Sequence, residues 1–333
     1  MTDEMTLGSP QGRGGASERV TLTPVDGADV TVLVENSIDN FLIDDEVAKR
    51  PAWTRQLAPD VLRAEHGLAL LLTVHHNGRS QSILYDAGNG RDTAVYNMDV
   101  LSLQIKDLRA VVVSHGHPDH MGGMEGLLRR VGRQGMPLIL HPDAWKERKL
   151  VFPSGFETYL PQPTPQDLGR DGVELVEERG PTMLIDGTVL VTGEVSRTTD
   201  FEKGFPLQYA RGADGWEPDF MVWDEQAVIV NVRDKGLVVL AGCSHPGIIN
   251  IVKHAQRMTG IDRIHAVIGG FHLTGGIFER IIPRTLDELA ALAPAAIVPG
   301  HCTGWKAIHA IALRMPEAYV QTSVGTRLEF RSA

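Results

Sequence analysis

The sequence predicts an α/β fold in which short buried strands alternate with amphipathic helices. Residues 108–113 form a β-branched run of strand length, and the Leu and Met residues of 124–131 recur at helical spacing. The same alternation returns between residues 237 and 313. With 333 residues, of which 42% are hydrophobic and 22% charged, the chain has enough apolar material for a full core.

The first part of the chain is predicted to be a tail followed by strands and two helices. Residues 1–20 are rich in Gly and Ser and lack the apolar core of a signal peptide, which predicts a flexible tail. Alternating apolar residues on both sides of His76-Asn77-Gly78 predict a hairpin. The predicted elements are strands at 20–34, 68–74, 82–86, 108–113 and 136–141, and helices at 89–106 and 124–131.

Residues 142–181 interrupt this pattern. The segment is rich in Pro, Gly, aromatic and charged residues, and it contains Trp145, Phe152, Phe156 and Tyr159. Such segments are more often insertions on a scaffold than domains of their own. We therefore predict a single domain over residues 21–333, with an insertion at about 142–181 that forms a lid or substrate wall. A packed surface loop is the alternative.

Regular structure is predicted to return after residue 181. Buried runs and helical spacing again alternate, as expected for the second half of an α/β sandwich. The predicted elements are a strand at 188–192, a hairpin of 220–223 and 227–232, strands at 237–241, 265–269 and 296–299, and helices at 247–258, 285–292 and 305–313.

Composition argues against two classes of partner. A net charge of −10 and a pI near 5.7 disfavour nucleic acid, which needs a basic surface. Apolar runs such as 68–74 are far shorter than the roughly 20 residues of a membrane-spanning helix. The only cysteines, Cys243 and Cys302, are expected to be reduced thiols of a cytoplasmic protein. We expect a small-molecule substrate, and a homo-oligomer is compatible with the sequence.

The run Ser114-His-Gly-His-Pro-Asp-His-Met-Gly-Gly123 gathers three imidazoles and a carboxylate into six residues on a predicted strand-to-helix loop. His115 and His117, two residues apart, can project to one side, whereas Asp119 and His120 diverge from them. The spacing therefore predicts two half-sites. Solvated loop histidines are the alternative, but this density of ligands favours zinc, iron or manganese.

This run resembles the signature of the metallo-β-lactamase superfamily, whose fold is a four-layer αββα sandwich with a metal site at one edge of its sheets. Residues 83–88 and 298–302 resemble two further strand ends of that family. Within it, segments such as Gly242-Cys-Ser-His-Pro-Gly247 and Gly269-Gly-Phe-His-Leu273 resemble a subgroup labelled 7,8-dihydropterin-6-methyl-4-(β-D-ribofuranosyl)aminobenzene-5'-phosphate synthase. The label describes a transfer reaction and does not define the substrate of this chain.

The resemblance implies a set of metal ligands. His115 and His117 would bind a first ion, and Asp119, His120 and His301 a second. Asp86 would orient a ligand histidine through a hydrogen bond. We expect two zinc ions, with manganese or iron as alternatives.

The chain departs from the family pattern at the strand ends that complete the site. Where many relatives have a histidine, this chain has Glu194, which we expect to ligate as a carboxylate. Where many have a bridging Asp, it has Cys243, whose thiolate can bridge two soft cations. Alternatively Cys243 is a small buried residue and His245 reaches the metals. His272 is expected to ligate a metal or to donate a proton.

The predicted function is metal-assisted hydrolysis of an ester, lactone, thioester or phosphodiester. Asp119 would hold the attacking water, and His272 or His245 would protonate the leaving group. The alternatives are a synthase-like transferase with a pterin pocket walled by aromatic residues, a metabolite-binding module with little turnover, and a redox protein with iron in the same cage.

Overall fold

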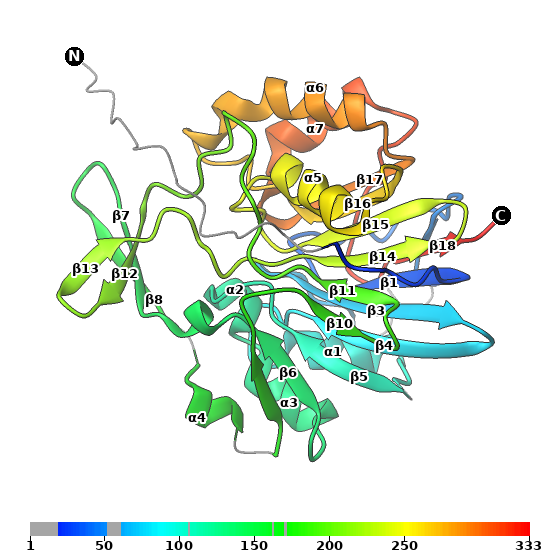
Figure 1. Cartoon of the computed structure of the whole chain (residues 1–333), viewed down its shortest axis with the longest axis horizontal. Helices are drawn as coiled ribbons and strands as arrows, with labels where there is room; N and C mark the ends of the chain where they lie inside the picture. Colours follow the sequence, from blue (N-terminus) through cyan, green and yellow to red (C-terminus); the bar gives the residue numbers. More distant parts are fainter. Residues whose placement is uncertain (1–18, 52–60, 106, 162, 170–171) are drawn as a thin grey trace.

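The computed structural model describes residues 19–51, 61–105, 107–161, 163–169 and 172–333 (Figure 1). Most of the predicted tail, residues 1–18, lies outside this range. The described chain contains two large sheets, a third small sheet, and helices on the outer faces.

The two large sheets enclose the central core. The eight-stranded sheet has the order β2-β18-β1-β3-β4-β5-β6-β9, and the six-stranded sheet the order β10-β11-β14-β15-β16-β17. Apolar side chains from both sheets meet between them, for example Leu72, Ile83, Val230 and Leu240, which are all fully buried. The strands are β1 Gly27–Val34, β2 Ala48–Lys49, β3 Ala69–His76, β4 Arg79–Tyr85, β5 Leu108–Val112, β6 Pro137–Leu140, β9 Glu174–Glu177, β10 Thr182–Leu184, β11 Val189–Val191, β14 Val228–Val232, β15 Gly236–Ala241, β16 Ile264–Gly270, β17 Ala296–Gly300 and β18 Arg327–Arg331.

Helices cover the outer face of each large sheet. α5 (Ile248–Thr259), α6 (Ile282–Leu292) and α7 (Trp305–Arg314) pack on the six-stranded sheet through a second apolar cluster. α1 (Thr93–Val100) and α3 (Met124–Val131) pack on the eight-stranded sheet through a third. The order helix, sheet, sheet, helix confirms the predicted αββα sandwich (Figure 1).

Parallel pairing determines where the ligand-rich loops lie. β4, β5 and β6 are parallel neighbours in one sheet, and β15, β16 and β17 are parallel neighbours in the other. The carboxyl ends of parallel strands meet at one edge of a sheet, and side chains that follow them can therefore converge. The short helix α2 (Pro118–Met121) and the 3-10 helices η2 (Pro142–Trp145), η4 (Phe278–Ile281) and η5 (His301–Thr303) lie in these loops.

Three predicted elements differ from the structure, the first being the strand predicted at 20–34, which starts only at Gly27. Residues 220–223 are a turn, not a strand, and β14 pairs with β11 and β15 instead. The turn forms because the carboxylates of Asp219 and Asp224, on either side of it, both bind Arg148. The helix predicted at 89–106 is shorter, because the main-chain N–H groups of Asn89 and Gly90 donate to Glu65 ahead of α1.

The insertion contributes to two different sheets. β7 (Arg148–Val151) and β8 (Glu157–Leu160) join β12 (Gln208–Gly212) and β13 (Gly215–Pro218) in a four-stranded sheet that projects from the sandwich (Figure 1). After the short helix α4 (Pro165–Leu168), β9 instead extends the eight-stranded sheet beside β6. In the part of the chain that is described, no helix is long and apolar enough to span a membrane.

Candidate metal centre

The loop after β5 brings the first predicted ligands to the sheet edge. His117 has extended backbone, and Pro118 starts α2 directly after it with Asp119 in the first turn. Gly116 has no side chain, and any Cβ there would collide with the main chain of Ala144. The loop therefore packs closely against η2, and His115, His117 and His120 are all buried.

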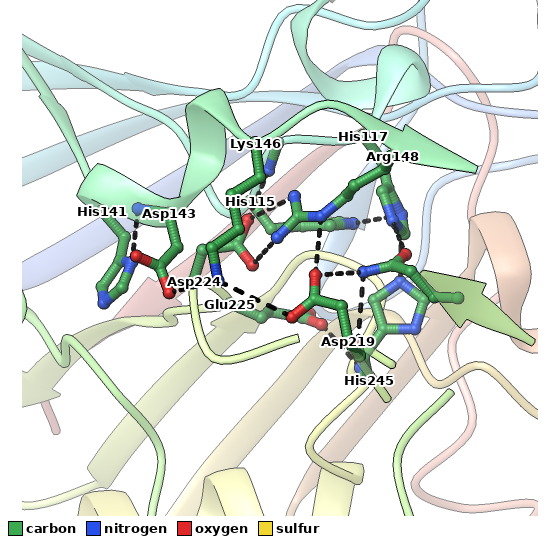
Figure 2. A network of polar contacts seen from close by, with 12 residues as sticks. His115, His117, His141, Asp143, Lys146, Arg148, Asp219, Asp224, Glu225 and His245 are labelled. Atoms are coloured by element: carbon green, nitrogen blue, oxygen red, sulfur yellow. Dashed lines mark hydrogen bonds and ion pairs between the residues drawn. The ribbon is translucent and has the colours of Figure 1, made fainter. Parts of the chain in front are cut away.

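Three imidazoles form a first ligand group. His117 Nδ1 lies 3.0 Å from His115 Nε2 and 3.2 Å from His245 Nε2 (Figure 2). Burial lowers the pKa of His115 and of His245 well below the ordinary range, and with Arg148 it lowers the pKa of His117 to about 4. The three rings are therefore neutral, the form that binds metal, and their nitrogens converge.

A second group contains Asp119, His120, Cys243 and His301. Cys243 Sγ lies 3.2 Å from His120 Nε2 and 3.3 Å from His301 Nε2, and Asp119 Oδ2 lies 3.3 Å from the same His301 nitrogen. Imidazole, thiolate and carboxylate together suit a zinc-like ion. The donor set thus fits a transition metal.

Asp86 contacts the second group as an orienting residue would. Its Oδ2 lies 2.6 Å from His120 Nδ1, which leaves His120 Nε2 facing Cys243. Its Oδ1 accepts from the main-chain N–H of Ser114, so the carboxylate is fixed at the end of β5. Burial alone would lower the pKa of His120, but Asp86 and Asp119 raise it to about 9. A metal ion bound there would have to displace this proton.

Cys243, His245 and His272 form a third group that overlaps both others. Burial, with the nearby His117 and His301, lowers the pKa of His272 to about 3. Burial raises the pKa of the Cys243 thiol well above its usual value, so only a bound cation would favour the thiolate. Cys243 and His245 each belong to two groups, and they therefore connect the half-sites.

Glu194 is not brought to this cluster, which corrects the expectation that it ligates metal. Among the described residues it belongs to none of the three groups. Its Oε1 instead lies 3.2 Å from His141 Nε2 and accepts from Arg179 Nη1 at 3.1 Å. Arg179 neutralises the carboxylate, and His245 supplies the third nitrogen of the first group.

Three residues at the site are outside the predicted ligand set, and two of them, Asn36 and His66, are in segments that we expected to be structural rather than catalytic. Asn36 Oδ1 lies 3.2 Å from His301 Nδ1, and Nε2 of the exposed His66 lies 3.3 Å from Asp119 Oδ2. Buried Glu225 accepts from the main-chain N–H groups of Ser244 and His245. Asn36 and His66 follow strand-like segments, which is a weak signal, and Glu225 lies in a turn, which gives none.

An αββα sandwich with these ligand groups at its edge defines a class of protein. The chain belongs to the metallo-beta-lactamase superfamily, whose family model matches residues 63–249. Members of this superfamily typically bind metal ions, and the His, Asp and Cys clusters described above are the residues available for them.

Curated relatives and solved structures agree with this assignment. The chain is 31% identical over 270 residues to 7,8-dihydropterin-6-methyl-4-(beta-D-ribofuranosyl)-aminobenzene-5'-phosphate synthase of Methanocaldococcus jannaschii, covering 80% of this chain and 90% of that protein. It is 29% identical over 250 residues to an uncharacterized protein of the same organism, covering 74% and 86%. The crystal structure of a metal-dependent hydrolase of the beta-lactamase superfamily aligns with a TM-score of 0.68 at 24% identity, over 92% of this chain and 100% of that one.

Proposed function

We propose that the chain is a metal-dependent hydrolase that holds two transition-metal ions, zinc in the first instance with manganese or iron as alternatives. The observation that carries the proposal is the pair of ligand groups connected through Cys243 and His245. His115, His117 and His245 would hold one ion, and Asp119, His120, Cys243 and His301 the other. Two ions held by these residues would supply a water of lowered pKa and would polarise the bond under attack.

The roles of the side chains follow from which atoms stay free. Asp119 Oδ2 lies near both His66 and His301, and Oδ1, which is 3.9 Å from His120 Nε2, is the oxygen that would orient a water by accepting a hydrogen bond. His245 directs Nε2 toward the first group, which commits that nitrogen to the metal. Nδ1 of His245 and Nδ1 of His272 are both buried without a hydrogen-bond partner. Because both rings are neutral, either could donate a hydrogen bond from Nδ1 to the leaving group, and we keep both histidines as candidates for this role.

The substrate class we propose is a small ester, lactone, thioester or phosphodiester. Phe205 stacks on His245 with ring centroids 5.1 Å apart, and Phe278 lies 4.5 Å from the His272 ring. These rings place an apolar wall beside the ligands. Both cysteines are free and buried, which supports the proposed cytoplasmic location.

Transfer is the second candidate, and the named synthase relative favours it. A planar heterocycle could stack on Phe205 and Phe278, because both rings adjoin ligand histidines. Of the insertion aromatics expected for this wall, Phe156 and Tyr159 are exposed on or beside the four-stranded sheet. The rings that adjoin the candidate ligand histidines come from the loops after β11 and β16.

Metal analysis tests the proposal first. Purified protein should contain close to two transition-metal ions per chain, and His117→Ala and His120→Ala should each lower that content. His76→Ala, at the last residue of β3, is the matched control and should leave it unchanged. Full metal-independent activity of the wild-type protein would exclude the mechanism.

A substrate panel separates the candidates. Metal-loaded protein should hydrolyse at least one ester, lactone, thioester or phosphodiester. Coupling of a pterin substrate without hydrolysis would support the transferase. Tight binding of a metabolite without turnover would identify a binding module, and a coloured iron centre would indicate redox chemistry.

A further inference from the structure

A glutamine of the four-stranded sheet contacts a metal-ligand candidate directly. Gln208 begins β12 and is fully buried. Its Oε1 lies 2.5 Å from His117 Nε2, and its Nε2 donates to Asp219 Oδ2 at 2.9 Å. His117 therefore has partners on both sides of its ring: Gln208 at Nε2, and the nitrogens of the first ligand group at Nδ1.

These contacts determine which nitrogen of His117 carries the proton. Asp219 Oδ2 already accepts from Arg148 Nε, so the amide of Gln208 turns its NH₂ group toward this oxygen. The carbonyl oxygen of Gln208 then faces His117, and it can only accept. His117 must donate from Nε2, and the lone pair is left on Nδ1, which points toward His115 and His245.

Arg148 holds this arrangement from inside the four-stranded sheet. Its side chain is fully buried, with Nε donating to Asp219 Oδ2 at 2.9 Å and Nη1 to Asp224 Oδ2 at 2.9 Å (Figure 2). Asp224 Oδ2 also accepts from the main-chain N–H of Gly116 at 2.8 Å, between the two ligand histidines. One guanidinium therefore fixes both the backbone of the ligand loop and the acceptor that orients Gln208.

We propose that Gln208 is a positioning residue that fixes the tautomer of His117 and presents its Nδ1 to the metal. In consequence, the four-stranded sheet is part of the metal centre and not only a lid over it. The proposal rests on the proposed metal site, but not on hydrolysis. Residues 148, 208, 219 and 224 act only through His117 and the loop, and none belongs to a ligand group.

The tautomer can be measured directly in metal-free protein by long-range nitrogen–proton NMR of the histidine rings. Wild-type His117 should carry its proton on Nε2. Gln208→Met keeps the length of the side chain but removes the acceptor, so both tautomers should be populated. Gln208→Glu keeps an oxygen facing His117 and should retain the wild-type signature.

A larger effect of Gln208→Met than of Gln208→Glu distinguishes a positioning role of Gln208 from a packing role. A packing role predicts more damage from Gln208→Glu, which adds a carboxyl beside Asp219, than from Gln208→Met. Glu157→Gln is the control, because it breaks the Lys149–Glu157 pair of the same sheet without touching the network. Zinc retention against a chelator should fall about 10- to 100-fold in Gln208→Met and stay at the wild-type level in Glu157→Gln.

Two results would overturn the proposal. One is a wild-type His117 that carries its proton on Nδ1, and this measurement needs no variant to fold. The other is Gln208→Met with an unchanged tautomer and unchanged zinc retention. Because the tautomer is read without metal or substrate, a protein that binds zinc but hydrolyses nothing would refute the proposed function and leave this inference intact.

Discussion

Replacing Cys243 by serine should weaken metal binding more than the loss of any ligand that serves one group. The thiol lies 3.2 Å from His120 Nε2 and 3.3 Å from His301 Nε2, and it also belongs to the group of His245 and His272. Serine fills almost the same space, but its hydroxyl does not ionise near neutral pH. The substitution therefore removes one anionic ligand of the second group, which is also a member of the third group.

The expected loss of metal affinity follows from the number of ligands in the second group. Four-ligand zinc sites in peptides bind with about 10–16 kcal/mol at neutral pH, or roughly 3 kcal/mol per ligand. Loss of one ligand from the four-residue second group should therefore lower its affinity on the order of 100-fold. The half-site of three histidines should weaken less, because Cys243 is not one of its members.

Cobalt substitution provides the assay. Cobalt bound to wild-type protein should show a thiolate-to-metal charge-transfer band, which should disappear in Cys243→Ser. Cys302→Ser is the matched control, because Cys302 is also buried and donates to the Cys243 carbonyl but belongs to no ligand group. A band that survives in Cys243→Ser, or that disappears only in Cys302→Ser, would refute the assignment of Cys243.

Three further outcomes are expected. Arg148→Met should lower the free energy of unfolding by about 3–5 kcal/mol in urea titrations, because Asp219 and Asp224 stay buried without their cation; a loss below 1 kcal/mol would contradict this. Glu202 accepts hydrogen bonds from the first N–H groups of α5. Burial raises the pKa of its carboxyl group to about 7, so the folded state binds the carboxyl proton more tightly than the unfolded chain does. Its contribution is present at low pH and lost as the pH rises toward and through 7, and the stability difference between wild type and Glu202→Gln should fall from pH 5 to pH 8. Removing metal with a chelator should lower the melting temperature, since ligand at 100 times its Kd adds about 2.7 kcal/mol; the shift should be smaller in His117→Ala, which keeps only the second group intact.

The sequence predicted the sandwich, and it predicted that most of the candidate ligands lie close together, for a physical reason. Buried strands of parallel sheets are continuous apolar runs, and polar residues directly after them mark the sheet edge. His115, His120 and His301 follow such strands, and the structure brings them together. The Arg148 network had no comparable signal, because its members are on separate segments and interact only through the four-stranded sheet.

The loop after β15 accounts for both expected departures from the family pattern, Glu194 and Cys243. Ser244 has a left-handed backbone with φ of 65°, and Glu225 accepts from the N–H groups on both sides of this turn. The turn lets two residues of one short loop serve different groups: Cys243 faces His120, and His245 faces His117. His245 thus supplies the imidazole that position 194 lacks, while Glu194 is bound to Arg179. His245 already occupies the position of a third imidazole in the first group. Replacing Glu194 by histidine should therefore not add a metal ligand to that group.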